Sequence, residues 1–470
     1  MDFSGKFGLT PDIIEKDYIL GWLLAGIAQS VELSASWVFK GGTCLKKCYF
    51  ETYRFSEDLD FTLKQAEHQD SGFLVNQFKE ITGWIYSAAG IEFPPGLIKF
   101  DVYKNSLGKT SVQGKIAYLG PLQRGGDPPR VKLDLTANEA LVLEQCIREV
   151  NHPYSDKPEG GIHIRCYCFE EIFAEKVRAL AERLRPRDLY DVIHLYRHDD
   201  TRHGRITILN TLEAKCRYKG ISMPSIEILE RKPERAELVS EWENMLGHQV
   251  PVLPPFEQFW QELPEVFDWL YRSAEKATPA VIPTMGQAID TSWHPPSVAQ
   301  AWGLAQPLEV IRYAASNRLC VDLAYQGDHR LIEPYSLRRT QDGNLLLYAV
   351  KHDTGENRSY RVDRIEGAKA TKTPFIPRYA IELTGAGPIS APHTRRAPRL
   401  APASPRRIRH ASGWSAGRTM ASGPSYIFRC SVCNKRFMHK SYNSVLSSHK
   451  DKRGYPCPGR SGIYVTTKFK

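Results

Sequence analysis

Long apolar runs are missing from this 470-residue chain. No stretch approaches eighteen apolar residues, and no charged start precedes an apolar segment. We therefore expect neither a bilayer span nor a secretion signal, no membrane partner, and a cytoplasmic protein. Cysteine is sparse: ten scattered residues fit reduced thiols better than the disulfide framework of a secreted protein. Internal repeats are also missing, so a repeat architecture is not expected.

Acidic residues are almost missing from the end of the chain. Residues 386–470 hold 17 Lys and Arg and one acid, Asp451, so that this segment carries +16 while residues 1–385 sum to −6. A basic tail on a near-neutral body points to a polyanionic partner, most often a nucleic acid.

The remaining composition predicts a folded, multi-domain chain. Of all residues 42% are hydrophobic and 11% aromatic, over a length too great for a single core. Residues 1–275 predict a mixed α/β (α+β) domain. Its expected strands are residues 37–42, 54–63 and 130–136, and its expected helices are residues 13–31, 170–184 and 187–198, followed by a largely helical stretch at 205–272.

Four further segments follow this domain. Residues 276–305 form a proline-rich linker. Residues 306–385 contain short strands at nearly regular spacing with glycine-containing turns, which predicts a small, strongly bent sheet. Residues 386–424 are rich in Arg, Pro, Ser and Ala and predict a disordered basic linker, whereas residues 425–470 predict a compact terminal module.

The turn after the first expected strand carries Gly41, Gly42 and Thr43, fifteen residues ahead of Asp58 and Asp60. Carboxylates at i and i+2 of a strand project from one face, so the two aspartates are close enough to hold one or two Mg²⁺ (or Mn²⁺) ions. Glycine lets a backbone approach closely, and amides at the start of a helix can hold terminal phosphates. Together these features predict a clamp for a nucleoside triphosphate.

Further residues extend this interpretation. Asp134 could supply a third carboxylate from a neighbouring strand, and Lys176 lies on the apolar face of its expected helix, where it could face the triphosphate. Asp188 and Asp191 share one helix face. Each feature has a plain alternative: a simple turn, a solvated strand face, a lysine that snorkels from an apolar stripe, and acids that cap a helix start.

These residues together resemble the AbiEii/AbiGii toxin family of nucleotidyltransferases, which includes toxins of abortive-infection and MenAT-type toxin–antitoxin systems. The resemblance implies a polymerase-β-like nucleotidyltransferase fold, in which a short mixed sheet carries the site and a helical second half packs on it. The matching stretches occur in family order over about residues 10–270: "FKGGTCLKKCY", "RFSEDLDF", "AYLGPL", "VKLDLTANEAL", "EEIFAEKVRALAERLRPRDLYDV" and, more loosely, "PPFEQFWQEL".

The resemblance also implies roles for individual residues. The implied nucleotide-binding residues are Gly41, Gly42, Thr43, Lys46 and Arg183. The implied catalytic residues are Ser56, Asp58, Asp60, Lys176, Asp188 and Asp191, with Lys176 at the triphosphate and Asp188 or Asp191 completing the site. Asp58 and Asp60, with Asp134, would hold Mg²⁺. Relatives add nucleotides to the 3′ acceptor end of tRNA, which blocks aminoacylation and translation, and are restrained by a cognate antitoxin.

Residues 311–380 resemble a divergent WYL domain, a ligand-sensing, Sm-like β module of bacterial regulators and phage-defence proteins. The similarity rests on "IEPYSL" and "YRVDRI", since "LLYA" stands where the namesake tripeptide would be. Arg338, Arg339, Arg358 and Arg361 could gather an anionic or nucleic-acid ligand, the alternative being solvated strand-end arginines. The module implies that control of the first domain is partly built into the chain.

The terminal module contains the spacing of a metal site. Cys430 and Cys433 form a CxxC pair, followed after fifteen residues by His449 and after seven more by Cys457. Such ligands form a closed, structural Zn²⁺ site, with His439 as an alternative to His449. Basic and aromatic side chains around them predict RNA or DNA binding, a purely structural finger with a soluble basic face being the alternative.

The combined prediction is a nucleotidyltransferase toxin or phage-defence effector. Its substrate would be an NTP and its acceptor an RNA, with tRNA favoured and pyrophosphate released. One alternative is a WYL and zinc-finger regulator that binds nucleic acid and whose first domain binds nucleotide without catalysis. A second alternative keeps the catalysis but transfers the nucleotide to a protein such as an antitoxin.

Overall fold

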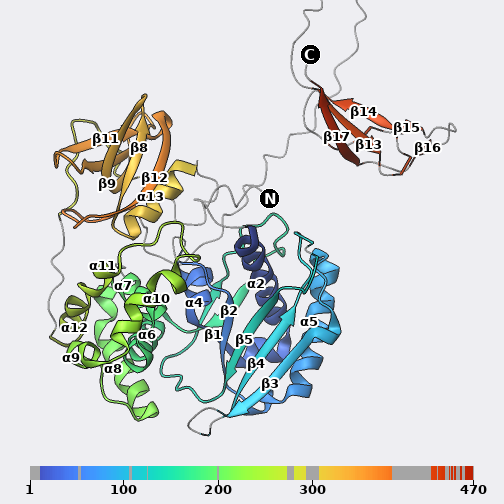
Figure 1. Ribbon diagram of the computed structural model, residues 1–470, viewed down its shortest axis with the longest axis horizontal. Helices are drawn as coiled ribbons and strands as arrows, with labels where there is room; N and C mark the ends of the chain where they lie inside the picture. The colour runs from blue at the N-terminus through green and yellow to red at the C-terminus, as the bar shows by residue number, and fades with distance from the viewer. Residues whose placement is uncertain are drawn as a thin grey trace, which may run out of the picture. The chain divides into compact units, whose positions relative to one another are not determined.

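The computed structural model forms two compact units, Met1–Thr394 and Arg395–Lys470. Figure 1 traces their helices and strands. The basic linker expected at 386–424 lies outside the described residues, as does much of the linker expected at 276–305. Within the described part of the chain, no helix combines the length and the apolarity that a bilayer crossing requires. The described residues are 11–50, 54–104, 108, 110–123, 125–197, 201–272, 280–292, 306–383 and part of 425–468.

A seven-stranded mixed sheet, ordered β3-β4-β5-β2-β1-β7-β6, underlies the candidate site. Strand β1 pairs antiparallel with β2 and parallel with β7, and β2 pairs parallel with β5. The two strands that carry the predicted turn and aspartates therefore lie side by side near the sheet centre. The strands are β1 (Trp37–Lys40), β2 (Asp58–Leu63), β3 (Ile98–Lys104), β4 (Thr110–Ala117), β5 (Arg130–Thr136), β6 (Cys146–Glu149) and β7 (His163–Cys166).

Helices pack on this sheet around the strands that carry the site (Figure 1). Helix α5 contacts β3 and α2, and α2 contacts β7. The Asp70 side chain caps α5 by accepting a hydrogen bond from the Phe73 amide at 2.7 Å, which satisfies one of the amides that a helix start leaves open. The elements of this layer are α2 (Pro11–Gln29), α3 (Val31–Ser36), α5 (Ser71–Ala89), η2 (Ala66–Gln69) and η3 (Pro95–Leu97).

The helix expected after the glycine turn is present but changes its pitch. Helix α4 (Gly41–Cys44) continues directly as a π-helix, η1 (Leu45–Tyr49). Short π segments occur frequently at functional sites. Lys47 of η1 lies 2.7 Å from the Asp17 carboxylate of α2 in a buried ion pair, which anchors this segment to the helical layer.

A helical half follows β7, as the sequence predicts. Lys176 is 9% exposed and lies on the buried face of α6 with Ile172, Phe173 and Leu180. Helix α6 packs against both α7 and α8. The helices are α6 (Phe169–Arg183), α7 (Pro186–Arg197), α8 (Thr201–Lys219), α9 (Ile226–Arg231), α10 (Arg235–Leu246), α11 (Phe256–Trp260) and α12 (Leu263–Arg272).

The small sheet expected after the linker has five strands in the order β11-β10-β9-β8-β12. The pairing of β9 with β10 shifts register at Tyr348 and Ala349, an irregularity that increases local bend and twist. The prediction of a small, bent sheet is therefore confirmed. Its elements are α13 (Gln306–Ser316), β8 (Leu319–Tyr325), β9 (Asp328–Arg339), β10 (Leu345–Lys351), β11 (Asn357–Arg361), η5 (Val362–Arg364) and β12 (Ile365–Pro374).

The described residues of the terminal unit form two small sheets. The larger has the order β14-β13-β17, and the smaller pairs β15 with β16. Phe428, Cys430, Leu446 and Cys457 form its small buried cluster. Its strands are β13 (Ser425–Cys430), β14 (Arg436–His439), β15 (His449–Lys450), β16 (Pro456–Cys457) and β17 (Gly462–Lys468).

A buried charge network ties the sheet to the helical half. Lys215 of α8 lies 3.0 Å from Glu171 and 3.2 Å from Glu175, both on α6, and donates to the Ala140 carbonyl at 2.9 Å. Glu175 also pairs with Lys40, the last residue of β1, at 3.3 Å. Because buried carboxylates are costly unless paired, Lys215 fixes α6 relative to the end of β1.

We expect Lys215→Met to lower the free energy of unfolding by about 3–5 kcal/mol, because the buried Glu171 loses its cation and Glu175 is left with Lys40, while the side-chain volume is kept. Chemical denaturation of the full chain measures this change. Arg217→Met is the matched control on the same helix: its ion pair with Glu213 is exposed, so the expected change is within ~0.5 kcal/mol. Equal effects of the two substitutions would contradict the role of the network.

Candidate active site

The turn after β1 touches the acidic strand directly. Gly41 has a φ of +79°, a left-handed conformation that favours glycine. A Cβ atom added there would lie 2.0 Å from Asp60 Oδ2, and Asp60 is paired in register with Lys40. Gly41 is therefore required both by its backbone conformation and by the approach of the carboxylate. The predicted proximity of turn and aspartates is confirmed.

Three aspartates lie on two adjacent strands beside this turn. Asp58 and Asp60 alternate with buried Leu59 on β2, and Asp134 of β5 is the parallel register partner of Asp60. The pKa of Asp60 is raised from 3.8 to about 6: burial is the largest cause, Lys40 and Lys176 lower the pKa, and Asp134 and Asp58 raise it. Burial also raises the pKa of Asp58.

This arrangement fits a divalent cation. Mg²⁺ is bound by carboxylate oxygens, and it would lower the raised pKa values by relieving the repulsion between the aspartates. Asp134 lies where a third metal ligand is expected, because its strand, β5, pairs with the strand that carries Asp60.

The other residues of the turn contact the segment that leads into β2. A Cβ atom at Gly42 would lie 2.7 Å from an Arg54 guanidinium nitrogen and 3.1 Å from the Ser56 hydroxyl. The Thr43 hydroxyl donates to the Asp58 carbonyl. Lys46 of η1 places its ammonium 4.6 Å from the centre of the Phe55 ring. The predicted residues Gly42, Thr43, Lys46 and Ser56 therefore surround the start of the acidic strand.

A second cluster, on α6 and α7, combines cations with two fully buried aspartates. Lys176 lies 2.7 Å from Asp191 and 3.6 Å from Asp188. Arg54 donates to both Asp191 oxygens at 2.8 and 2.9 Å, and Arg183 donates to both Asp188 oxygens at 2.6 and 2.9 Å. We call these five residues the cation cluster.

Within the cation cluster, each predicted residue has a specific electrostatic role. Burial alone would raise the pKa of Asp191, but Arg54 and Lys176 lower it below its ordinary value, so this carboxylate is charged. Asp188 and Asp191 therefore act as counter-ions that orient Lys176, Arg54 and Arg183. Lys176 in turn is close enough to Asp60 to oppose the rise of its pKa. The two clusters are therefore near enough to interact electrostatically.

Several residues of the site were missed from the sequence. Arg54 precedes the aspartate motif by four residues, but nothing local indicated its pairing with Asp191. Arg187 has a buried Nε with no hydrogen-bond partner among the described residues, and its charge interacts with that of Asp58. Lys40 keeps a raised pKa despite burial, because Glu175, Glu139 and Asp60 are near. Lys40 and Arg187 directly adjoin predicted residues, which is the one signal that could have identified them.

The four arginines of the small β domain all have acidic partners. Arg339 bonds to Asp290, Arg358 to Glu356, and Arg361 to Asp363. Arg338 bonds to Glu382, and its guanidinium carbon lies 4.7 Å from the centre of the Tyr348 ring. Because each arginine is paired with a nearby acid, the structure favours the alternative of strand-end arginines over a gathered anion site, although the alternative expected them to be solvated rather than paired.

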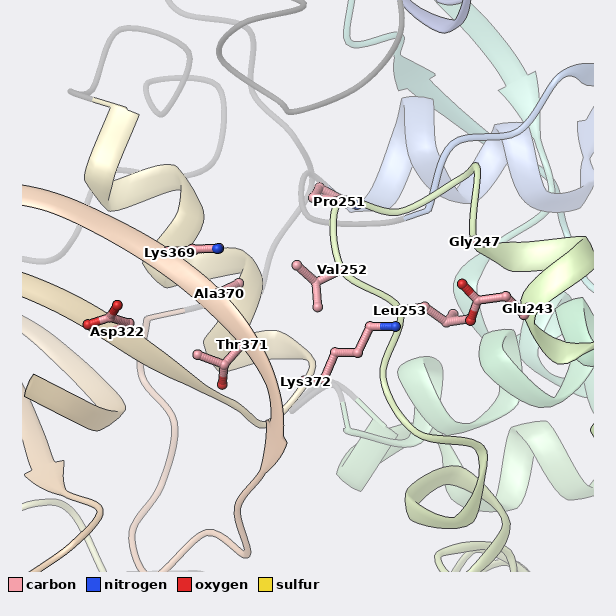
Figure 2. A pocket seen from close by; sticks show the side chains of 10 residues that line it. All are labelled: Glu243, Gly247, Pro251, Val252, Leu253, Asp322, Lys369, Ala370, Thr371 and Lys372. Carbon is pink, nitrogen blue, oxygen red and sulfur yellow. The ribbon is translucent and has the colours of Figure 1, made fainter.

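A cavity of about 470 Å³ lies where this domain meets the loop after α10. Figure 2 shows the Lys372 side chain of β12 extending towards that loop. The loop also reaches the cation cluster: Gln249 accepts from Arg54 through its side chain and from the Phe55 amide through its carbonyl, each at 2.9 Å. The cavity is lined by Glu243, Gly247, Pro251, Val252, Leu253, Asp322, Lys369, Ala370, Thr371 and Lys372.

The expected metal ligands of the terminal unit converge. Cys430, Cys433, His449 and Cys457 place their ligand atoms within 4.8 Å of one another. The His449 Nδ1 atom lies 2.9 Å from the Ser447 carbonyl, a hydrogen bond that would leave Nε2, 3.3 Å from the Cys433 sulfur, to face a metal. His439 is not part of this group; it packs edge-on against Phe428.

We expect Asp60→Asn to stabilise the metal-free protein at pH 7.5 by roughly 1–3 kcal/mol, because ionised Asp60 is destabilising in the fold. Its pKa is about 6 folded against an ordinary 3.8, so the wild type loses this stability as the pH rises from about 4 to 6. The gain from Asp60→Asn should vanish near pH 4. With millimolar Mg²⁺ the order should reverse, because the wild type gains a ligand. Denaturation at both pH values, with and without Mg²⁺, measures this, and a pH-independent difference would contradict it.

Comparison with known proteins agrees with this geometry. Residues 22–272 match the family model described as nucleotidyl transferase AbiEii toxin, type IV toxin–antitoxin system, and residues 306–370 match the WYL domain. A search of curated proteins finds no match.

Two solved structures are similar to part of this chain at low identity. MenT4, a nucleotidyltransferase toxin from Mycobacterium tuberculosis H37Rv, is 18% identical with a TM-score of 0.37, over 57% of this chain and 85% of that one. JHP933 from Helicobacter pylori is 17% identical with a TM-score of 0.37, over 56% and 94%. The AbiEii model covers more than half of the chain, and the chain therefore belongs to the AbiEii family of nucleotidyltransferase toxins.

Proposed function

We propose that this chain transfers a nucleotide from an NTP to RNA, with the 3′ end of tRNA as the favoured acceptor, and so blocks translation. The observation that carries this proposal is the contact of Asp60 with the backbone turn at Gly41, with Asp58 on the same strand, Asp134 on the adjacent strand and Lys176 near enough to lower the Asp60 pKa. The three carboxylates would hold one or two Mg²⁺ ions, which when bound supply neutralising charge to the triphosphate.

The chain's own residues would position and neutralise the nucleotide. Amides of Gly42 and Thr43 would bind the terminal phosphates at the start of α4, with Ser56 beside them. Lys176 would place positive charge where charge develops on the leaving pyrophosphate, and Arg187 would contribute its unpartnered Nε–H. The acceptor hydroxyl oxygen attacks the α-phosphorus and loses its proton to solvent, while the bond from the α-phosphorus to the bridging oxygen breaks and pyrophosphate leaves. Asp188 and Asp191 hold the cations in place.

The terminal unit supports an RNA acceptor. Cys430, Cys433, His449 and Cys457 would hold a structural Zn²⁺ ion, around which Arg429, Lys435 and Arg436 are exposed. Exposed cations in a segment of net charge +16 would attract phosphates, and this attraction would weaken with salt. A cognate antitoxin is a further proposed partner, because the family is defined by toxin–antitoxin systems.

Incubation of the full chain with labelled NTPs, Mg²⁺, total RNA and total protein tests the proposal. We expect label in small RNA, reduced at least 100-fold by Asp58→Ala, which removes a metal ligand, and by Lys176→Ala, which removes transition-state charge. Asp101→Ala is the matched control: its carboxylate lies exposed on β3, so activity should be unchanged. Cys433→Ser should raise the KM for RNA and leave that for NTP unchanged.

The other outcomes of this assay identify the alternatives. Label in protein alone would replace RNA by a protein acceptor such as an antitoxin. NTP binding with no label in either fraction would favour a regulator that binds nucleic acid without catalysis. Growth arrest on expression that persists in Asp58→Ala would contradict the enzymatic proposal.

We also propose that the WYL domain controls transfer through α7. Asp188 and Asp191 of this helix belong to the cation cluster, whereas Tyr190 donates to the buried Asn317 side chain at the end of α13, at 2.9 Å. Arg318 pairs with Glu262 at 2.9 Å across the same contact. A change in the WYL domain therefore has a direct path to the residues that orient Lys176.

Tyr190→Phe leaves the Asn317 oxygen without its donor and should loosen α7. We expect transfer to slow several-fold, and hydrogen exchange of α7 amides to accelerate, with the fold retained. Tyr196→Phe is the control, because this tyrosine of α7 donates to Glu265 of α12 instead. Equal effects of the two substitutions on transfer would contradict coupling through Asn317.

A further inference from the structure

Three buried thiols converge directly behind the phosphate turn. Cys44 and Cys48 lie four residues apart on the continuous α4–η1 segment and so share one face. Cys166 ends β7, where it pairs with Phe39 of β1. The three sulfur atoms all lie within 4.8 Å of one another, and each side chain is at most 1% exposed. We call these residues the thiol triad.

The surroundings of the triad distinguish it from ordinary core cysteines. Cysteine often behaves as a small hydrophobic residue, but such packing does not require three sulfurs to meet at one point. Arg148 and Cys146 lie on one face of β6, and Cys146 is the register partner of Cys166. The Arg148 guanidinium carbon lies 4.1 Å from the centre of the Tyr49 ring, and its buried Nε has no hydrogen-bond partner among the described residues. A positive charge therefore accompanies the triad.

We propose that the thiol triad binds a thiophilic d¹⁰ metal ion, Zn²⁺ or Cu⁺, through Cys44, Cys48 and Cys166. Metal–thiolate bonds of about 2.3 Å place ligand sulfurs about 3.8–4.0 Å apart, so the observed spacing needs only small side-chain rotations. Soft thiolates select these ions over Mg²⁺.

Charge and coordination number favour different ions. Three thiolates around Zn²⁺ sum to −1, which Arg148 balances, whereas three around Cu⁺ sum to −2. A set of three sulfurs without a fourth ligand among the described residues suits Cu⁺ better, because structural Zn²⁺ takes four ligands. Both ions would link the α4–η1 segment to β7, and Cys44 directly follows Thr43. A bound metal would thus hold the segment that follows the phosphate turn in place. This proposal does not depend on which acceptor the enzyme uses.

Metal content of the full chain, purified under reducing conditions from cells grown with added zinc or copper, tests this site. We expect the wild type to hold one more equivalent of Zn²⁺ or Cu⁺ than Cys166→Ser. Cys216→Ser is the matched control, because Cys216 is equally buried on α8 but lies outside both metal groups, and it should retain the wild-type content. Cys433→Ser should lose only the equivalent of the terminal unit.

A second measurement keeps the test independent of whether Cys166→Ser folds. Cys433→Ser leaves the triad intact and disrupts the terminal metal group. When this variant is purified from cells grown with added zinc or copper, it should retain one equivalent of metal. Thiolate charge-transfer absorption should appear when Cd²⁺ or Cu⁺ occupies the same site. Absence of metal from Cys433→Ser under both growth conditions would overturn the proposal. Equal metal content in the wild type and folded Cys166→Ser would do the same.

Discussion

Repulsion among Asp58, Asp60 and Asp134 is the constraint on which the rest of the site depends. Like charges repel more strongly in a protein interior than in water, and here the fold places three aspartates on two adjacent strands. It does so by backbone geometry: neighbouring strands fix Asp60 beside Asp134, and the missing Cβ of Gly41 admits the Asp60 carboxylate. Burial leaves Asp60 with a raised pKa. The fold thus favours cation binding at these aspartates, and without a cation their ionisation lowers the stability of the protein.

The positive charge of the cation cluster is likewise balanced by ion pairs. Asp188 and Asp191 are completely buried, and they are compensated by Lys176, Arg54 and Arg183. Lys215 compensates the carboxylates that orient the end of β1. Because removal of either partner leaves an unpaired buried charge, these networks hold the two sides of the site at a fixed spacing. Helix α7 belongs both to the cation cluster and, through Tyr190, to the contact with the WYL domain.

Local sequence patterns predicted β1, β2 and β5, the helical half and the bent WYL-like sheet. Glycine turns, the alternation of apolar and polar residues, and helical periodicity can each be recognised from residues close together in the sequence. The positions of Asp60 beside Gly41 and beside Asp134 followed from those strands. The partner of Arg54 did not, since Asp191 is 137 residues away and an ion pair depends on how α7 packs. Strands β3, β4, β6 and β7 and helix α5 were not predicted. For the same reason the sequence shows Cys44 and Cys48 as one helix face but cannot show that Cys166 completes the triad.

The central claim is that one cation-binding centre serves one triphosphate between the carboxylates and the cation cluster. Anomalous diffraction from crystals of the full chain with Mn²⁺ and a non-hydrolysable NTP tests it most directly. The account predicts manganese between Asp58 and Asp60, beside Asp134, with the terminal phosphates at the Gly41–Thr43 turn and within reach of Lys176. Manganese or nucleotide bound elsewhere, with this centre vacant, would contradict it.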